Sequence, residues 1–128
     1  MELKKVLLVD DDAGFNFLTQ LALKEHGVTC IIDSVLNGQL ALDYIAEQGC
    51  PDVILLDINM PIMNAFEFLA EYEKLDKCVS HTKIYILSSS LRDSDRNICL
   101  SWKFVNGYFE KPLTDVHIDE VLKAVENA

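Results

Sequence analysis

The aspartates at positions 10, 11 and 12 are consecutive and directly follow the aliphatic run Val6–Val9. A further aspartate, Asp57, follows a second aliphatic run, and no histidine or cysteine stands beside any of the four. Carboxylates without such neighbours favour a hard cation such as Mg²⁺, which takes one or two carboxylates, a carbonyl and water and then recruits phosphate oxygens. These residues therefore indicate phosphate chemistry, with Asp57 as the candidate nucleophile on phosphorus.

Two other polar groups also end apolar runs. The run 83–88 ends in Ser88, the first of three serines, and the run 107–111 ends in Lys111, which precedes a proline. An ammonium could neutralise charge on a phosphoryl group, and a hydroxyl could hydrogen-bond one of its oxygens. The same residue types are also common in loops, so their value depends on whether the fold brings them to the aspartates.

Five short apolar runs, separated by segments with helical spacing, predict the elements that would position these groups. The runs cover residues 5–10, 29–35, 52–57, 83–88 and 107–111. The first, third and fourth are nearly continuous, which is typical of strands covered on both faces. The order (βα)₅ predicts an α/β fold with a parallel sheet and helices on both faces. Ligands of such sheets bind beyond the carboxyl ends of the strands, where the polar groups above would converge.

Helix ends are marked by capping residues. Asp12 is a candidate N-cap for the first helix, Asn64 with Glu67 resembles a capping box, and Thr114 is a candidate N-cap for the last helix. Gly27 and Gly49 stand where the first two helices should stop. The fourth helix is predicted over residues 92–105, where its start is polar.

Composition limits the classes of function. The chain has 128 residues and a net charge of −10, which fits one domain and argues against binding to nucleic acid or to an anionic membrane. The four cysteines form no C-x-x-C pair, which predicts free buried thiols in a reducing compartment. The N-terminal apolar run is too short for a signal peptide or a membrane span, so we expect a cytoplasmic location.

Four segments together resemble a known family. LLVDDD, LLDINMP, ILSSS and YFEKP are similar, in this order, to the motifs of the response-regulator receiver domain, the phosphoacceptor half of two-component signalling. The resemblance covers essentially the whole chain. It implies a flavodoxin-like, doubly wound sheet of five parallel strands in the order 2-1-3-4-5. It also implies a single receiver domain over residues 1–128 with no attached output domain.

The resemblance implies a role for individual residues of the site. Asp57 matches the phosphoacceptor, and Asp10 and Asp11 match the acidic pair of the family. Asp11 would bind Mg²⁺ directly, and Asp10 would act through water. The backbone carbonyl of Asn59 would complete the metal site. Lys111 matches the ammonium of the family, and its peptide bond to the following proline would be cis.

The resemblance also implies a switch, with one departure from the family pattern. Ser88 matches the switch hydroxyl, and Tyr108 matches an aromatic residue that turns inward on activation. Ala65 stands where the family usually has glycine, eight residues after Asp57. If this position needs a positive φ, the Cβ of alanine costs about 1 kcal/mol.

The function implied is a phosphorylation-dependent switch rather than an enzyme, beyond self-phosphorylation and autodephosphorylation. A sensor histidine kinase or a phosphotransfer protein would donate to Asp57. The face built by residues 92–105, 107–111 and 114–125 would then change its affinity for a downstream protein target. We expect a monomer or weak dimer, with no nucleic-acid or membrane partner.

Two alternatives to this switch are open. One is a Mg²⁺-dependent phosphohydrolase with an aspartate nucleophile, although its pattern D-x-D-x-[TV] is not met by residues 10–14, which end in glycine. The other is a receiver-like docking protein that takes no phosphate.

Overall fold

The computed structural model describes residues 2–89 and 92–128, which form one five-stranded sheet and six helices. All strand pairs are parallel, and their order β2-β1-β3-β4-β5 confirms the predicted flavodoxin-like fold. The strands are β1 (Lys5–Val9), β2 (Ile31–Val35), β3 (Val53–Leu56), β4 (Lys83–Ser88) and β5 (Val105–Glu110). The helices are α1 (Ala13–Glu25), α2 (Gly38–Gln48), α3 (Ala65–Tyr72), α4 (Asp76–His81), α5 (Asp93–Ser101) and α6 (Asp115–Glu126).

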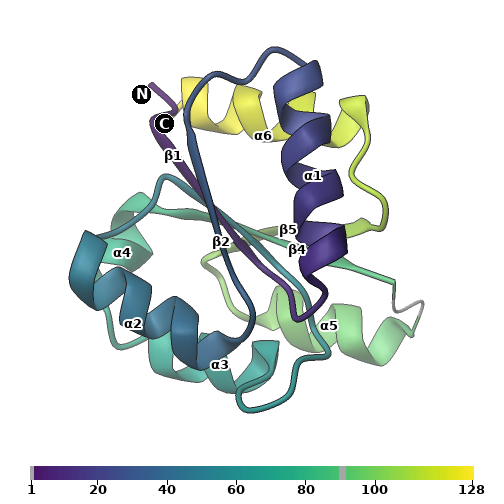
Figure 1. Ribbon diagram of the computed structural model, residues 1–128. Helices are drawn as coiled ribbons and strands as arrows, with labels where there is room; N and C mark the ends of the chain where they lie inside the picture. Colours follow the sequence, from purple (N-terminus) through teal and green to yellow (C-terminus); the bar gives the residue numbers. More distant parts are fainter. Residues whose placement is uncertain (1, 90–91) are drawn as a thin grey trace.

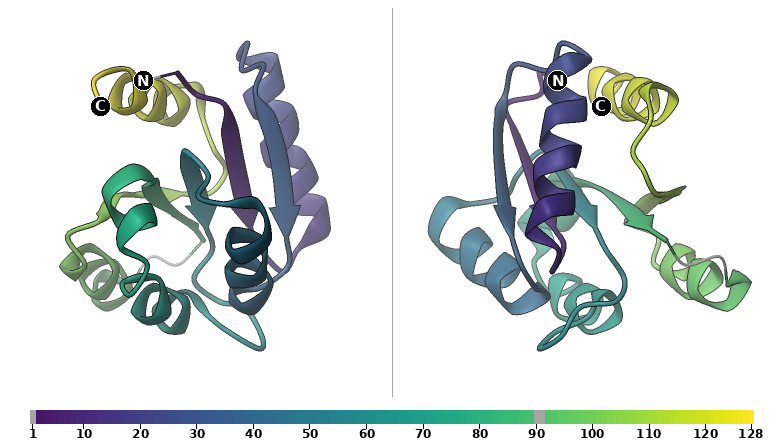
Figure 2. Two further views of the ribbon diagram at one scale, coloured as in Figure 1. Left: turned by 90° about the vertical axis from the view of Figure 1, so that its left-hand side faces the viewer. Right: turned by 45° about the vertical axis from the view of Figure 1, so that its right-hand side comes forward.

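The helices form two layers, one on each face of the sheet (Figure 1). Figure 2 shows α1 and α6 together on one face, whereas α2, α3 and α5 cover the other. The buried core is accordingly split in two by the sheet. In β1, Leu7 and Val9 belong to the core under α2, α3 and α5, and Val6 and Leu8 belong to the core under α1 and α6. Because both faces are buried, the strand reads as a continuous apolar run.

Capping side chains fix the first turns of three helices as predicted. The Asp12 carboxylate accepts a hydrogen bond from the N–H of Phe15, and Asn64 and Glu67 form a reciprocal capping box at α3. At α6 the Thr114 hydroxyl accepts from the N–H of His117, whose ring accepts from the N–H of Thr114. Each cap satisfies backbone donors that have no partner within the helix.

The prediction of four free thiols is wrong. Cys50 and Cys78 form a disulfide with their Cα atoms 5.2 Å apart, and Cys30 and Cys99 are free. Cys78 lies on α4, a short helix that the sequence did not predict. The helix carries this thiol back to the start of β3, so the pairing depends on an element without a recognisable sequence pattern.

One helix end and one strand start differ from the sequence predictions, and the backbone at Ala65 shows which side of a conditional expectation holds. The helix predicted over residues 92–105 ends at Ser101, and Val105 already begins β5. Ala65 needs no positive φ: it is fully buried and begins α3 after its Asn64 cap. Among the described residues other than glycine, it is Ile62 in the preceding loop that has a positive φ, of 76°. The peptide bond Lys111–Pro112 is cis, as predicted.

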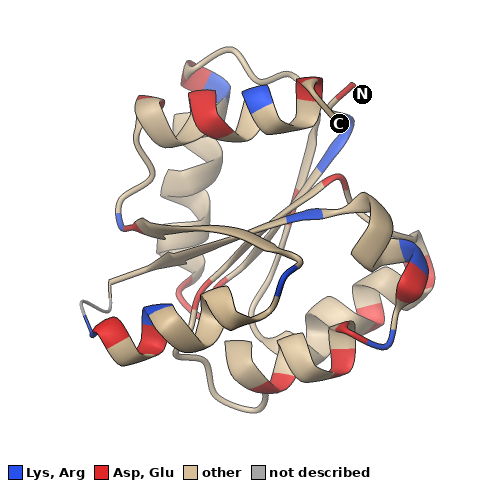
Figure 3. Cartoon of the chain, turned by 180° about the vertical axis from the view of Figure 1, so that it is seen from behind, with Lys and Arg blue, Asp and Glu red and all other residues tan. Residues whose placement is uncertain are grey.

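Acidic residues outnumber basic residues in this chain. Figure 3 shows acidic positions on most of the helices, with fewer basic positions among them, in agreement with the net charge of −10. In the part of the chain that the structure describes, no helix is both long enough and apolar enough to cross a membrane.

Candidate functional site

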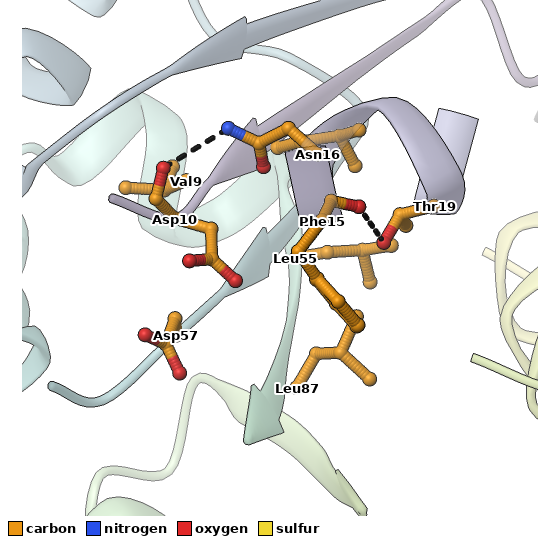
Figure 4. Close-up of a pocket in the computed structure, with 9 residues that line it drawn as sticks. Val9, Asp10, Phe15, Asn16, Thr19, Leu55, Asp57 and Leu87 are labelled. Carbon is orange, nitrogen blue, oxygen red and sulfur yellow. Dashed lines mark hydrogen bonds between the residues drawn. The ribbon is translucent and has the colours of Figure 1, made fainter. Parts of the chain in front are cut away.

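The carboxyl edge of the sheet brings three of the predicted aspartates together. Each of Asp10, Asp11 and Asp57 has a carboxylate oxygen within 4.8 Å of the other two. Asp10 follows β1 and Asp57 follows β3, the strand paired with it, so parallel pairing places the two residues side by side. The N–H of Asp57 donates to the carbonyl of Val9 at 2.9 Å and extends this pairing by one residue. Figure 4 shows the carboxylates of Asp10 and Asp57 next to each other.

Lys111 lies between the two buried carboxylates. Its Nζ is 2.6 Å from Asp10 Oδ2 and 3.5 Å from Asp57 Oδ1. The backbone N–H of Lys111 donates to the backbone carbonyl of Ser88 at 2.9 Å, and this bond ties the end of β5 to the end of β4. The second carboxylate oxygen of Asp10 accepts from the N–H of Asp12 at 2.9 Å. Lys111 and Asp10 thus form a shielded ion pair, and Asp57 is its neighbour.

The environment of Asp57 favours its neutral form. Burial raises the pKa of its carboxyl group, the negative charge of Asp10 raises it further, and Lys111 only partly offsets the two. The resulting pKa is about 6, compared with an ordinary value of 3.8. Two carboxylates crowded beside one ammonium leave uncompensated negative charge. A cation or a neutralising ligand at this edge would offset the negative charge of Asp10, one of the two causes of the shift.

The donor set fits the magnesium ion that the sequence predicted. The group of Asp10, Asp11 and Asp57 offers hard carboxylate oxygens and contains no histidine or cysteine. Asp11 is exposed, whereas Asp10 and Asp57 are buried, so the group opens to solvent on one side. Mg²⁺ keeps several waters when it binds and therefore needs such an open side.

The remaining predicted site residues differ in how far their side chains are buried. Ser88 is fully buried at the last position of β4, and Asn59 is exposed two residues after Asp57. Tyr108 is half-buried in β5 at the register position of Ile86, where it packs against the core under α2, α3 and α5. The structure thus gathers Asp10, Asp11, Asp57 and Lys111, with Ser88 joined to Lys111 through its carbonyl. The metal role of Asn59 and the switch roles of Ser88 and Tyr108 stay predictions.

Two residues of α1 belong to this site although the sequence did not single them out. The Asn16 amide is buried and donates to the carbonyls of Asp10, at 3.0 Å, and Val35, at 3.4 Å. It therefore fixes the turn that carries the acidic pair. The ring of Phe15 lies 4.1 Å, centroid to Nζ, from the ammonium of Lys111. The available sequence signal for Asn16 was its position seven residues before Leu23, which places the two on the same, buried face of α1.

Known proteins share both the sequence pattern and the fold. The sequence model of the response regulator receiver domain matches residues 6–125. The chain is 43% identical over 75 residues to a protein-glutamate methylesterase/protein-glutamine glutaminase of Treponema denticola, a match over 58% of this chain and 20% of that protein. It is 28% identical over 114 residues to the probable methanogenesis regulatory protein FilR2 of Methanothrix harundinacea, over 85% of this chain and 72% of the relative. The chain thus spans about a fifth of the length of the first relative.

A solved structure gives the same result over the full length. The two-component response regulator from Cytophaga hutchinsonii superposes with a TM-score of 0.94 at 28% sequence identity, and the match covers 100% of both chains.

Proposed function

The chain belongs to the response regulator receiver domain family of two-component signalling, and from this membership we propose that Asp57 is its phosphoacceptor. The observation that carries the proposal is the arrangement of charge at the carboxyl edge of the sheet. Asp57 is buried beside Asp10, shares the Lys111 ammonium with it, and has a pKa raised to about 6. A nucleophilic carboxylate with an ammonium beside it and an open acidic group next to it suits phosphoryl transfer.

The chain's own residues would act as follows. A carboxylate oxygen of Asp57 forms a bond to phosphorus while the bond between phosphorus and the donor's imidazole nitrogen breaks. The imidazole leaves with the electron pair of that bond and takes up a proton from water. Lys111, already between the two carboxylates, pairs with the phosphoryl oxygens. Mg²⁺ held by Asp11, Asp57, the Asn59 carbonyl and, through water, Asp10 would offset the negative charge of these oxygens.

The phosphoryl group would act as a switch rather than as a reaction product. It adds about 1.5–2 negative charges and strong acceptor oxygens. We propose that Ser88 and Tyr108 respond to it and that the face of α5, β5 and α6 then changes its affinity for a protein target. The acidic charge of the chain supports a protein partner rather than a nucleic acid. We propose a sensor histidine kinase or phosphotransfer protein in the cytoplasm as the donor, and a monomer or weak dimer as the acting species.

The test is phosphorylation by a small donor. The protein is incubated with Mg²⁺ and acetyl phosphate, and its intact mass is measured together with the acid and base lability of the adduct. We expect one added phosphoryl group, which is absent without Mg²⁺ and absent in Asp57→Asn.

The matched control is Asp52→Asn. Asp52 is equally buried and flanks the other end of the same strand, but it lies outside the acidic group. This variant should be phosphorylated like the unmodified protein. Absence of an adduct in the unmodified protein would contradict the proposal and favour a docking role. Rapid turnover of many phosphate esters without a stable adduct would favour a phosphohydrolase.

A further inference from the structure

The Lys111 ammonium has a third neighbour besides the two carboxylates. Its Nζ lies 4.1 Å from the centroid of the Phe15 ring, compared with 2.6 Å from Asp10 Oδ2 and 3.5 Å from Asp57 Oδ1. A cation at this distance from an aromatic face is attracted by the electron density of the ring. Only 16% of the Lys111 side chain is exposed, so water screens this attraction little.

The position of Phe15 is fixed from two sides. Its N–H donates to the Asp12 carboxylate at 3.0 Å, and its carbonyl accepts from the buried Thr19 hydroxyl at 3.0 Å. The side chain lines the same small cavity as Leu55, Leu87, Asp10 and Asp57 (Figure 4). The ring therefore belongs to the wall of the acidic site and is not a free surface group.

The Phe15 ring can support the Lys111 ammonium while the ammonium changes its hydrogen-bond partners. Lys111 is held more closely by Asp10 than by Asp57, although a phosphoryl group would arrive at Asp57. A hydrogen bond to Asp10 fixes the direction of an N–H group, whereas the attraction to the ring requires only that the ammonium stay over the ring face. The ammonium can thus turn toward new oxygens without losing the ring. An aliphatic residue at this position would leave the flexible lysine stem without this support.

We propose that Phe15 is a positioning residue for Lys111: its ring holds the ammonium between Asp10 and Asp57, where it can pair with an incoming phosphoryl group. The inference rests on the proposed function, because it concerns the same phosphoryl transfer. It goes beyond that function by assigning a role to an apolar residue of α1.

The role is tested by changing the electron density of the ring while keeping its shape. Phe15 is replaced with mono-, di- and trifluorinated phenylalanine, and the rate constant of phosphorylation by acetyl phosphate is measured at one concentration of Mg²⁺. Each fluorine should slow the reaction further, with a total decrease of about three- to tenfold, as expected for a shielded cation–π contact. The same replacements at Phe17, which is 64% exposed on the same helix, should leave the rate unchanged.

A second measurement needs neither metal nor phosphate. In metal-free protein, the protons on Cε of Lys111 should show an upfield ring-current shift by NMR. The shift should disappear in Phe15→Leu and persist in Phe17→Leu. A missing shift in the unmodified protein would overturn the contact itself.

The outcomes also separate this role from the function it rests on. Normal phosphorylation with equal rates across the Phe15 series would overturn the positioning role and leave the phosphoacceptor intact. An unmodified protein that takes no phosphoryl group would overturn the proposed function and this role with it.

Discussion

Two aspartates flank the strand β3, Asp52 before its first residue and Asp57 after its last. Each has 7% of its surface exposed, and each has a charged or ionisable neighbour within reach. Their pKa values nevertheless move in opposite directions, down for Asp52 and up to about 6 for Asp57. Burial raises the pKa of both carboxyl groups, more strongly at Asp57, and the groups around them add to the difference.

At the amino edge of the sheet, donors surround Asp52. One carboxylate oxygen accepts from the N–H groups of Lys4, at 2.8 Å, and Lys5, at 3.0 Å, and the other lies 2.7 Å from Nε2 of His81. Together these donors outweigh the effect of burial and lower the pKa of Asp52. Donors within the fold therefore compensate the negative charge of Asp52, and its carboxylate links β1, β3 and α4.

At the carboxyl edge, a second carboxylate competes for the available positive charge. Asp10 takes the shorter contact with Lys111 and adds its own negative charge to the surroundings of Asp57. The comparison shows that burial alone does not mark a functional carboxylate. A shortage of donors around a buried carboxylate marks a functional site better, because the missing positive charge must then come from a ligand.

The largest effect is expected at the amino edge, from the disulfide that fastens α4 there. Cys50 and Cys78 are 28 residues apart, and a cross-link closing a loop of this length stabilises the folded state by roughly 3–4 kcal/mol. Denaturant unfolding with and without reductant should show this loss. Cys30→Ala, which removes a free thiol, serves as the control. Under denaturing, non-reducing conditions two thiols should react with a thiol reagent; four would contradict the cross-link.

The second-largest effect is expected for Asp57→Asn. This replacement should stabilise the folded state, whereas loss of the disulfide destabilises it. Because the folded-state pKa of about 6 lies above the ordinary value of 3.8, protonation of Asp57 favours folding. This contribution is fully present below about pH 4 and is lost as the pH rises through about 6. A shift of this size corresponds to at most about 3 kcal/mol. In metal-free buffer Asp57→Asn should therefore be more stable than the unmodified protein at neutral pH.

The pH dependence of that difference separates charge from packing. Both proteins share every other titrating group, so subtracting their unfolding free energies leaves mainly the contribution of Asp57. The difference should vanish toward pH 4. A constant difference at every pH, or a less stable variant at neutral pH, would show that Asp57 is not held in an unfavourable charge environment.

The sequence predicted the carboxyl edge much better than the amino edge, for a physical reason. Parallel strands end at a common edge, so Asp10 and Lys111 could be placed together although 101 residues separate them. Nothing comparable brings His81 to Asp52 or Cys78 to Cys50. Those contacts depend on α4, a six-residue helix whose first residue has no side-chain cap. Tertiary packing rather than local pattern determines such a short helix.

A smaller effect is expected for Asp52→Asn, again with the opposite sign to Asp57→Asn. A lowered folded-state pKa means that the ionised carboxylate stabilises the fold above the ordinary value of 3.8. This stability is lost as the pH falls through the folded-state pKa. The asparagine keeps the shape but has one acceptor oxygen for three donors, so we expect a loss of about 2 kcal/mol at neutral pH. Unfolding curves from neutral to acidic pH should show the two proteins converging.

The smallest effect, from His81→Gln, tests whether the donors of Asp52 act together or singly. The glutamine amide can still donate to the carboxylate, and the backbone N–H groups of Lys4 and Lys5 are untouched. Because His81 is partly exposed, the loss should be below about 1 kcal/mol by denaturant unfolding. Combined with Asp52→Asn, it should add almost nothing, since the carboxylate that it serves is already gone. Additive losses would mean that His81 stabilises α4 independently and that backbone donors alone account for the charge at the amino edge.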